Sequence, residues 1–199
     1  MSLVAIRREV DADNSCLFSS MAYLLDRMNY GDFSATNFRQ IIVEYLLSNK
    51  FDSTLLDLPK NEYIEFIINP ANWGGALEIK MFSEIFEKQI CSIDVKTKRV
   101  DIYGQDKNYP ETIYLLYNGI HYDPLVMNTD YSSDSNCDIT IFDSNDSYVF
   151  DSMKELVGKC NDYHDFNSLQ CEICNLKIVN QNEAYEHSIV TQHWNYKQI

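Results

Sequence analysis

The stretch Asp11-Ala12-Asp13-Asn14-Ser15-Cys16-Leu17-Phe18 joins a polar turn directly to the start of a predicted helix. Short Asp and Asn side chains bond to nearby backbone groups, so residues 11–15 are expected to form a compact, helix-capping turn. Cys16 then lies at a helix N-terminus, where unpaired N–H groups and the helix dipole favour a thiolate. The same N–H groups can stabilise an oxyanion. Taken alone, Cys16 equally fits the ordinary role of a small buried side chain.

The pattern of apolar residues beyond this turn predicts an α+β fold in which helices come first and a β-meander follows. Apolar residues recur with helical spacing after Cys16, and runs of β-branched and aromatic residues begin near residue 90. Residues 128–138 are polar and are expected to form a mobile loop. The expected helices cover residues 16–28, 34–47, 61–68, 76–87 and 148–157, and the expected strands cover residues 3–10, 90–95, 100–103, 113–117, 121–125 and 139–142.

Composition excludes several classes of function. The 199 residues carry 16 basic and 30 acidic side chains, a formal net charge of −14, which argues against binding to a bare phosphate backbone. The first residues lack the long apolar core of a secretory signal, and no apolar run is long enough to span a bilayer. The six cysteines are therefore expected to be reduced, in a cytoplasmic or nuclear protein that binds neither nucleic acid nor membrane.

A second candidate for chemistry is His121, which follows an Asn118-Gly119 turn. Asp123 is two positions further along the predicted strand, so its carboxylate projects from the same face as the imidazole. A bond between them would fix the tautomer and leave the other ring nitrogen to act as a base toward Cys16. The alternative is a structural strand histidine. Of the four histidines, two belong to the metal pattern below and His164 lies in the expected boundary segment, which leaves His121 as the candidate base.

The C-terminal segment contains the spacing C-x2-C-x12-H-x5-H, formed by Cys171, Cys174, His187 and His193. Two thiolates and two imidazoles satisfy tetrahedral zinc, so a structural Zn²⁺ is expected here. Because His193 is six residues after His187, the helix is expected to loosen near residues 190–192. A small core is expected from Phe166, Leu169, Leu176 and Tyr185. The expected domains are residues 1–160 and residues 161–199, with the boundary in residues 161–167.

Three motifs together carry a family resemblance. The runs at residues 13–18, at Trp73-Gly74-Gly75-Ala76 and at residues 119–124 resemble the Cys loop, variable loop and His loop of the ovarian-tumour (OTU) cysteine deubiquitinases. The similarity is greatest to the small members that have a single C-terminal C2H2 zinc finger. It implies a papain-like fold, with helices packed on a mainly antiparallel central sheet, followed by a ββα finger.

The resemblance also implies roles for individual residues. Cys16 would be the nucleophile and His121 the general base of a thiol isopeptidase that needs no metal for catalysis. Asp13 is counted among the active-site residues of this branch, while Asp123 occupies the position that orients the histidine in many members. Both acids are therefore candidates. Our preference for Asp123 as third member of the triad is a geometric inference.

The resemblance further implies how substrate would be held. Ile120 would contact the ubiquitin tail, whose diglycine must thread a narrow channel, and residues 73–83, including Trp73, Gly74 and Gly75, would frame that channel. Trp73 fits a core aromatic next to a tight turn equally well.

The implied partners are ubiquitin and polyubiquitin, on substrates that could belong to the pathway of the ATPase valosin-containing protein. The ATPase-docking domain usual in this branch is not expected in this chain, since the Cys loop begins by residue 10, and a monomer is expected. Two rival functions are a non-catalytic ubiquitin-binding module and a zinc-finger nucleic-acid adaptor. The finger helix disfavours the adaptor, because it carries Glu183 and Glu186 and no Lys or Arg.

Overall fold

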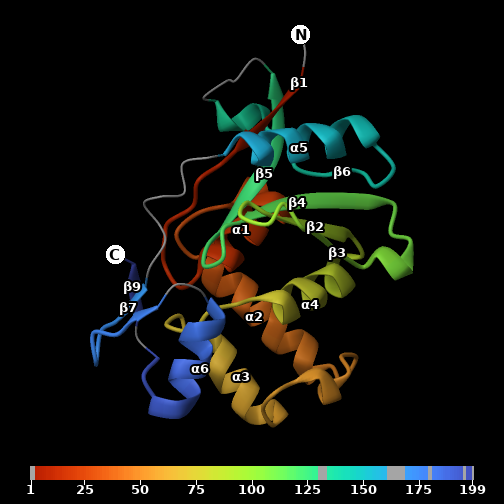
Figure 1. Cartoon of the computed structure of the whole chain (residues 1–199). Coiled ribbons are helices and arrows are strands. Elements are labelled where there is room, and N and C mark those ends of the chain that lie inside the picture. The colour runs from red at the N-terminus through yellow and green to blue at the C-terminus, as the bar shows by residue number, and fades with distance from the viewer. Residues whose placement is uncertain (1–2, 130–133, 161–168, 179–180, 195, 199) are drawn as a thin grey trace.

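The computed structural model describes residues 3–129, 134–160, 169–178, 181–194 and 196–198, and its centre is a mixed β-sheet (Figure 1). Within these residues, six strands pair in the order β1-β5-β4-β2-β3, with β6 beside β4. The strands are β1 (Leu3–Arg7), β2 (Gln89–Asp94), β3 (Val100–Tyr103), β4 (Glu111–Tyr117), β5 (Tyr122–Thr129) and β6 (Phe142–Asp143).

The sheet is mainly antiparallel, but it is not the simple meander expected from the sequence. Strand β4 pairs in parallel with β2, with Cys91 opposite Tyr114, while β3 pairs antiparallel with β2 on its other side. The chain therefore leaves β2 for the edge strand β3 and returns on the opposite side of β2. Local residue preferences identify the strands but do not specify which neighbour each one pairs with.

Helices cover both faces of the sheet. Figure 1 shows α5 on one side and α1, α2 and α4 on the other, so the architecture is the expected α+β class. The helices of the main body are α1 (Cys16–Leu25), α2 (Ser34–Leu47), α3 (Lys60–Ile68), α4 (Ala76–Phe86) and α5 (Ser147–Lys159). Among the described residues, none of the helices is both long and apolar enough to cross a membrane.

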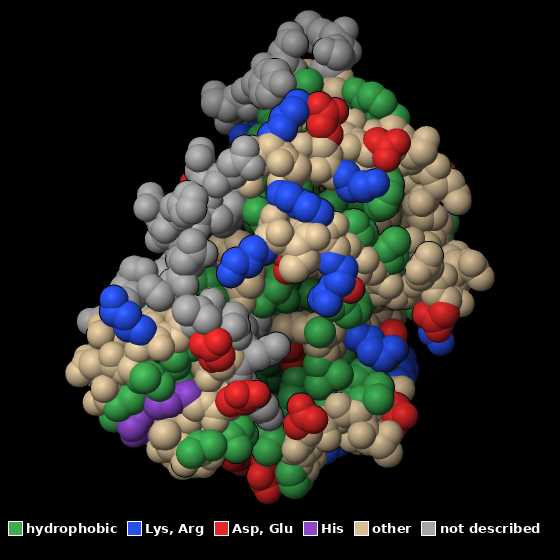
Figure 2. Space-filling model, viewed as in Figure 1, with side chains coloured by type: hydrophobic (Ala, Val, Ile, Leu, Met, Phe, Trp, Pro, Cys, Tyr) green, Lys and Arg blue, Asp and Glu red, His purple; other side chains and the backbone are tan. Residues whose placement is uncertain are grey.

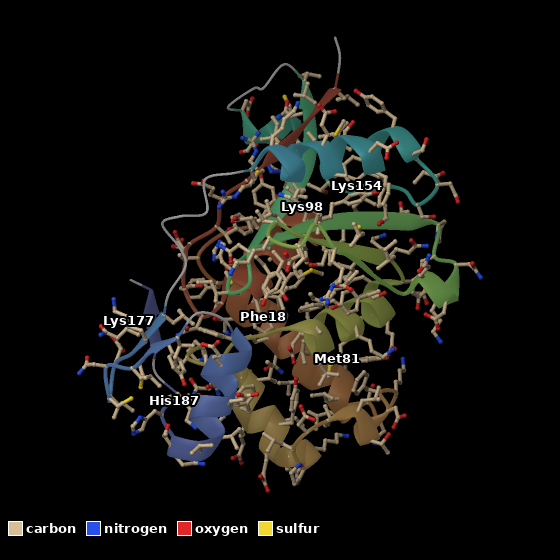
Figure 3. The ribbon with its side chains drawn as sticks, in the orientation of Figure 1. Phe18, Met81, Lys98, Lys154, Lys177 and His187 are labelled. Atoms are coloured by element: carbon tan, nitrogen blue, oxygen red, sulfur yellow. The ribbon has the colours of Figure 1, made fainter. Side chains whose placement is uncertain are left out.

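Strand β4 explains why one sheet supports two cores. Ile113 and Leu115 face the layer of α1, α2 and α4, whereas Tyr114 and Leu116 face α5. All four side chains are buried, as the continuous apolar run of a sheet covered on both faces requires. Figure 3 shows Phe18 and Met81 in the interior of the helical layer below the sheet. Each large apolar side chain buried in this way contributes about 2 kcal/mol.

The polar segment after β5 differs from the expected mobile loop. Asn128 is fully buried as part of β5, and its amide donates to the buried carboxylate of Asp138 at 2.6 Å. Arg8 and Tyr23 donate to the same carboxylate. The expectation is wrong at both ends of this segment, because buried polar groups are stable where they satisfy one another. Its middle, residues 130–133, lies outside the described residues.

The C-terminal unit contains β7 (Leu169–Cys171), β8 (Lys177–Ile178), α6 (Gln181–Thr191) and β9 (Tyr196–Gln198). Its sheet has the order β8-β7-β9, so one strand is added to the expected ββα pattern. Among its described residues, the buried hydrophobic cluster consists of Leu169, Ile178 and Ala184, whereas Leu176 is exposed, contrary to expectation. Phe166, the side chain of Tyr185 and the expected boundary at residues 161–167 lie outside the described parts.

Candidate active site

Cys16 is the first residue of α1 and is 7% exposed. The turn before it is held by Asp13, whose carboxylate accepts from the Ser15 N–H at 2.8 Å and whose carbonyl oxygen accepts from the Cys16 N–H at 3.4 Å. Ser15 is the N-cap residue of α1, but its side chain makes no capping hydrogen bond. The turn therefore forms as expected, without the expected side-chain cap. We refer to residues 11–16 as the Cys loop.

His121 lies immediately before β5 rather than within it. The Asn118 side chain shapes this loop by accepting from the backbone N–H groups of Ile120, at 3.0 Å, and His121, at 2.8 Å. Gly119 has φ +105°, a conformation that favours glycine. The Asn118-Gly119 turn therefore determines the position of the His121 side chain.

Asp123 bonds directly to His121, with 3.0 Å between Asp123 Oδ1 and His121 Nε2. The carboxylate is fully buried and also accepts from Arg7 Nε at 2.7 Å and from the Val10 N–H at 3.0 Å. Burial acts to raise the pKa of Asp123, but the His121 bond, the Val10 N–H and the Arg7 charge outweigh it and hold this pKa below its ordinary value. Asp123 is therefore a fixed, charged partner for the imidazole.

The imidazole of His121 bonds Asp123 through Nε2, and Cys16 is the second group that acts on its pKa. Burial lowers the pKa of His121, but hydrogen bonds to Asp123 and Cys16 and the charges of both groups raise it to about 10. Since Nε2 bonds Asp123, Nδ1 is the nitrogen left for the thiol. A protonated imidazole beside the cysteine favours a thiolate–imidazolium pair, the reactive state of a thiol nucleophile.

The second candidate acid, Asp13, occupies a different place. Its side chain is exposed and holds the turn at Ser15, and no hydrogen bond to His121 is found among the described residues. Next to it, Asn14 accepts a hydrogen bond from the Trp73 indole N–H. The structure therefore brings Asp123, rather than Asp13, to the imidazole, and it ties Trp73 to the Cys loop.

The three residues Trp73, Gly74 and Gly75 form a short loop before α4. The expected framing segment was longer, residues 73–83, but residues 76–83 belong to α4. Gly74 is pressed against α1: a Cβ there would come within 2.8 Å of the Phe18 ring. The Gly75 N–H donates to the buried Glu78 carboxylate at 2.7 Å. The loop is thus held against both neighbouring helices.

A cleft of about 360 Å³ lies beside these loops. It is bounded by the Cys loop, by Trp73 and by the His121 loop, and two residues of the C-terminal unit complete the lining. The lining residues are Ala12, Asp13, Asn14, Trp73, Ile120, His121, Leu169 and Tyr196. The candidate base, the exposed candidate acid, Ile120 and Trp73 therefore share one cavity. Gly74 and Gly75, which were also expected at the substrate channel, are not among its lining residues, and neither is Cys16.

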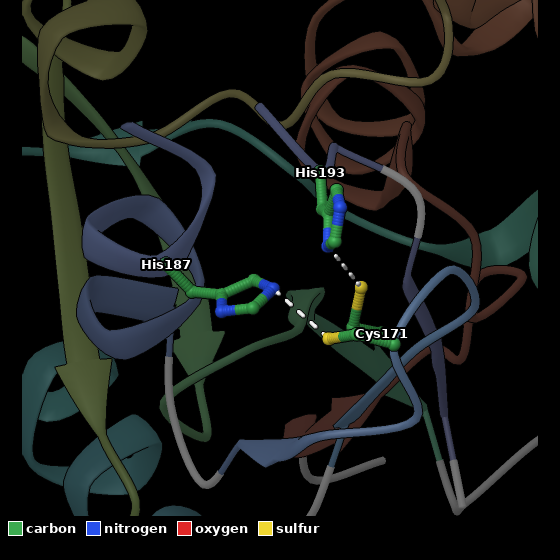
Figure 4. Close-up of side chains that lie close together, drawn as sticks. Cys171, His187 and His193 are labelled. Atoms are coloured by element: carbon green, nitrogen blue, oxygen red, sulfur yellow. Dashed lines mark hydrogen bonds between the residues drawn. The ribbon is translucent and has the colours of Figure 1, made fainter. Parts of the chain in front are cut away.

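The four residues of the C-x2-C-x12-H-x5-H pattern converge, with ligand atoms all within 4.8 Å of one another (Figure 4). Cys171 Sγ lies 3.6 Å from His193 Nδ1, and Cys174 Sγ lies 3.5 Å from His187 Nε2. Helix α6 ends at Thr191, and Gln192 adopts φ 61°, which turns His193 toward the thiols. This break falls at the end of the segment where loosening was expected.

The two sulfur–nitrogen distances fit tetrahedral zinc. With Zn–S and Zn–N bonds of about 2.3 and 2.1 Å, tetrahedral angles place sulfur and nitrogen ligands about 3.6 Å apart. Acidic side chains lie on the surface over α6 and α3 (Figure 2). Helix α6 itself carries Glu183 and Glu186, both of which are exposed. An acidic helix does not suit the negatively charged groove of DNA.

The sequence alone does not place several residues of this site. The sequence predicts Arg7 only as part of a strand, yet it bonds Asp123, and it predicts Arg39 only as part of a helix, yet it bonds the Cys loop. Leu169 and Tyr196 were not expected near the cleft. Nothing in local sequence signals these contacts, since each joins segments far apart in the chain.

Comparison with known proteins identifies a family and several similar proteins. Residues 11–132 match the family model of the OTU-like cysteine proteases. An Arabidopsis thaliana protein named ovarian tumor domain-containing deubiquitinating enzyme 2 is 31% identical over 100% of this chain and 99% of its own length. The Homo sapiens protein named ubiquitin thioesterase OTU1 is 33% identical over 98% of this chain, which spans 58% of the human protein. A solved OTU domain in complex with ubiquitin is 30% identical, with TM-score 0.65, over 78% of this chain and 86% of that one.

Proposed function

Because the chain belongs to the OTU-like cysteine protease family, we propose that it is a deubiquitinase. It hydrolyses isopeptide bonds that join ubiquitin to substrate proteins or to other ubiquitin molecules. The names of the relatives and the ubiquitin complex of a related domain support this substrate. The observation that carries the proposal is the His121 imidazole, which bonds the buried Asp123 carboxylate and interacts with Cys16 at a helix start.

The reaction follows from this arrangement. The Cys16 thiolate attacks the isopeptide carbonyl, and N–H groups at the start of α1 stabilise the oxyanion. His121 Nδ1 gives its proton to the departing lysine amine, which leaves a thioester on Cys16. A water, deprotonated by the same nitrogen, then attacks the thioester and releases the ubiquitin carboxylate and the thiolate. Asp123 holds the imidazole in place through both steps.

The C-terminal unit holds a structural Zn²⁺ through Cys171, Cys174, His187 and His193. The spacing of their ligand atoms supports this assignment. The metal would close a unit whose apolar core is only a few residues, and in such units metal binding supplies much of the folding free energy. Catalysis itself uses the thiol and the imidazole without a metal.

The proposal is tested with a panel of diubiquitins covering every linkage. The wild-type protein is expected to cleave at least one linkage, and Cys16→Ala none. Binding of ubiquitin without cleavage by the folded, reduced wild type would contradict the proposal and favour a non-catalytic ubiquitin-binding module. Salt-dependent retention on DNA or RNA, with neither binding nor cleavage of ubiquitin, would favour the nucleic-acid adaptor.

A further inference from the structure

Arg39 is a charged side chain in the interior, at 1% exposure, on the helix α2. Its guanidinium lies over the Phe18 ring, with Cζ 4.0 Å from the ring centroid. Among the described residues, no carboxylate forms an ion pair with it, and its Nε has no hydrogen-bond partner. Burial lowers the pKa of Arg39 to about 10. A cation buried in this way costs several kcal/mol, which an apolar side chain filling the same space would avoid.

Three of the four hydrogen bonds that Arg39 makes to described residues go to loops near the nucleophile, and the fourth goes to the end of α3. Nη2 donates to the carbonyl oxygen of Asn14 at 3.0 Å and to Ser15 Oγ at 2.9 Å, both in the Cys loop. The same nitrogen donates at 2.8 Å to the carbonyl oxygen of Asn72, next to the Trp73 loop. Nη1 donates to Ile67 at the end of α3. One side chain thus joins the two loops that bound the cleft.

We propose that Arg39 is a positioning residue, which fixes the Cys loop through Asn14 and Ser15 and so places a buried positive charge on the two residues that precede Cys16. The fixed loop keeps the N–H groups at the start of α1 in the geometry that an oxyanion needs. The charge favours the thiolate because it lies in an interior of low dielectric, where ionic interactions are weakly screened. The proposal rests on Cys16 being the nucleophile of the proposed function.

The pH profile of Cys16 alkylation by iodoacetamide tests the charge, and it requires no ubiquitin. Arg39→Met removes the charge and every donor at similar length, and its alkylation midpoint is expected to move upward by about half a pH unit or more. Arg39→Lys keeps the charge but cannot reach all the acceptors. It is expected to keep the midpoint while kcat/KM for diubiquitin falls about tenfold or more. Arg8→Met is the matched control, because it removes an arginine that pairs with Asp138 away from this loop.

Three results would overturn the proposal. One is a folded Arg39→Met protein with the wild-type alkylation midpoint, and another is an Arg8→Met midpoint that moves equally. The third result is a wild-type kcat/KM in Arg39→Lys. This variant also provides the test if Arg39→Met does not fold. Failure of the proposed function is separate, since it would be seen as intact diubiquitin with the wild type, whatever the alkylation profiles.

The C-terminal unit carries a different inference, because it forms part of the cleft. Leu169 and Tyr196 line the same cavity as His121. The Tyr196 ring lies 5.7 Å from the Trp73 ring, and Ile120 packs on the buried core of the unit. Trp194 lies against Phe66 of α3 at 5.7 Å. The unit is therefore packed against the loops that surround the candidate base.

The geometry points to the zinc finger as one wall of the substrate cleft, with Tyr196 as a specificity-determining residue that contacts the extended tail of ubiquitin. This inference rests on the proposed function. His121, Ile120 and three residues of the Cys loop line this cleft, so we expect the extended tail that carries the scissile carbonyl to pass through it. An aromatic side chain at such a wall typically contributes enough contact that its truncation weakens binding about tenfold.

Binding of ubiquitin to the inactive Cys16→Ala protein tests this wall by calorimetry. Adding Tyr196→Ala is expected to weaken binding about tenfold while zinc remains at one ion per chain. Leu176→Ala, which truncates an exposed residue of the same unit, is expected to leave binding unchanged. Unchanged or tighter binding with Tyr196→Ala would overturn the inference and leave the proposed function standing. Absence of any ubiquitin binding by the Cys16→Ala protein would overturn both.

Discussion

Replacing Asp123 with Asn separates the two candidate acids of the site. The change keeps the shape of the side chain but removes the charge that faces His121 Nε2 and Arg7. An amide cannot hold the imidazole in the same protonation state, and an acid-to-amide change at this position of a triad lowers kcat by about 10²–10⁴-fold. KM is expected to change little, because the buried carboxylate does not touch the substrate.

The same substitution has a stability cost that follows from its contacts. The substitution breaks the ion pair between the fully buried Asp123 carboxylate and the partly exposed Arg7. It is therefore expected to lower the free energy of unfolding by about 3 kcal/mol. For a chain of this size, that lowers Tm by roughly 6–12 °C. Because the pKa of Asp123 is held below its ordinary value, this stabilisation is present above about pH 4 and is lost as pH falls through the folded-state pKa. The difference in Tm from the wild type should therefore stay constant between pH 8 and 5 and shrink below pH 4.

The matched control is Asp13→Asn. Asparagine can accept the Ser15 N–H as Asp13 does, so this variant is expected to keep kcat within about threefold of the wild type. Steady-state cleavage of a fluorogenic ubiquitin amide at 25 °C, where both variants are folded, provides the comparison. A hundredfold loss with Asp13→Asn and near-normal turnover with Asp123→Asn would refute the reasoning and assign the orienting role to Asp13.

Three further predictions follow from the packing, the metal cluster and the imidazole. Gly74→Ala should lower the free energy of unfolding by about 1–3 kcal/mol, because its Cβ would press on Phe18; a denaturation midpoint equal to that of the wild type would contradict this. If the Cys/His cluster holds zinc as proposed, chelation should increase hydrogen exchange across the described residues of the C-terminal unit while the central sheet stays protected. Loss of protection throughout would show that the two units unfold together. Since the pKa of His121 is raised to about 10, its charge stabilises the fold at neutral pH and is lost as pH rises through that value. The difference in Tm between the wild type and His121→Gln should therefore shrink between pH 8 and 10.5. A difference that grows over this range would show that the charge on His121 destabilises the fold.

Much of the architecture could be predicted because its signals are local. Helix α2 has the expected bounds, since apolar residues recur along it with helical spacing. The period of two along a strand predicted that Asp123 would face His121, and the two side chains do bond at 3.0 Å. The break after α6 was predicted from the interval between His187 and His193. In each case, residues close together in the sequence determine the geometry.

The features that could not be predicted depend on distant segments. The parallel pairing of β2 with β4 depends on the path through β3, and no residue preference encodes it. The burial of Asp138 depends on Arg8 and Tyr23, which are more than 100 positions away. Arg39 resembles a solvent-exposed helix residue until the loops that surround it are in place. The packing of the C-terminal unit beside Trp73 likewise depends on complementary surfaces rather than on local pattern.

Cys16 is the proposed nucleophile for a ubiquitin carbonyl, and labelling with ubiquitin that bears a C-terminal electrophile reports on this role without any other step. Peptide mass spectrometry should find one ubiquitin per chain, attached to Cys16, although Cys16 is 7% exposed and Cys137 lies at the surface. His121→Ala should react far more slowly, because the thiolate loses its imidazolium partner. Attachment to Cys137 in place of Cys16, or no attachment to the folded and reduced protein, would show that Cys16 is not the nucleophile.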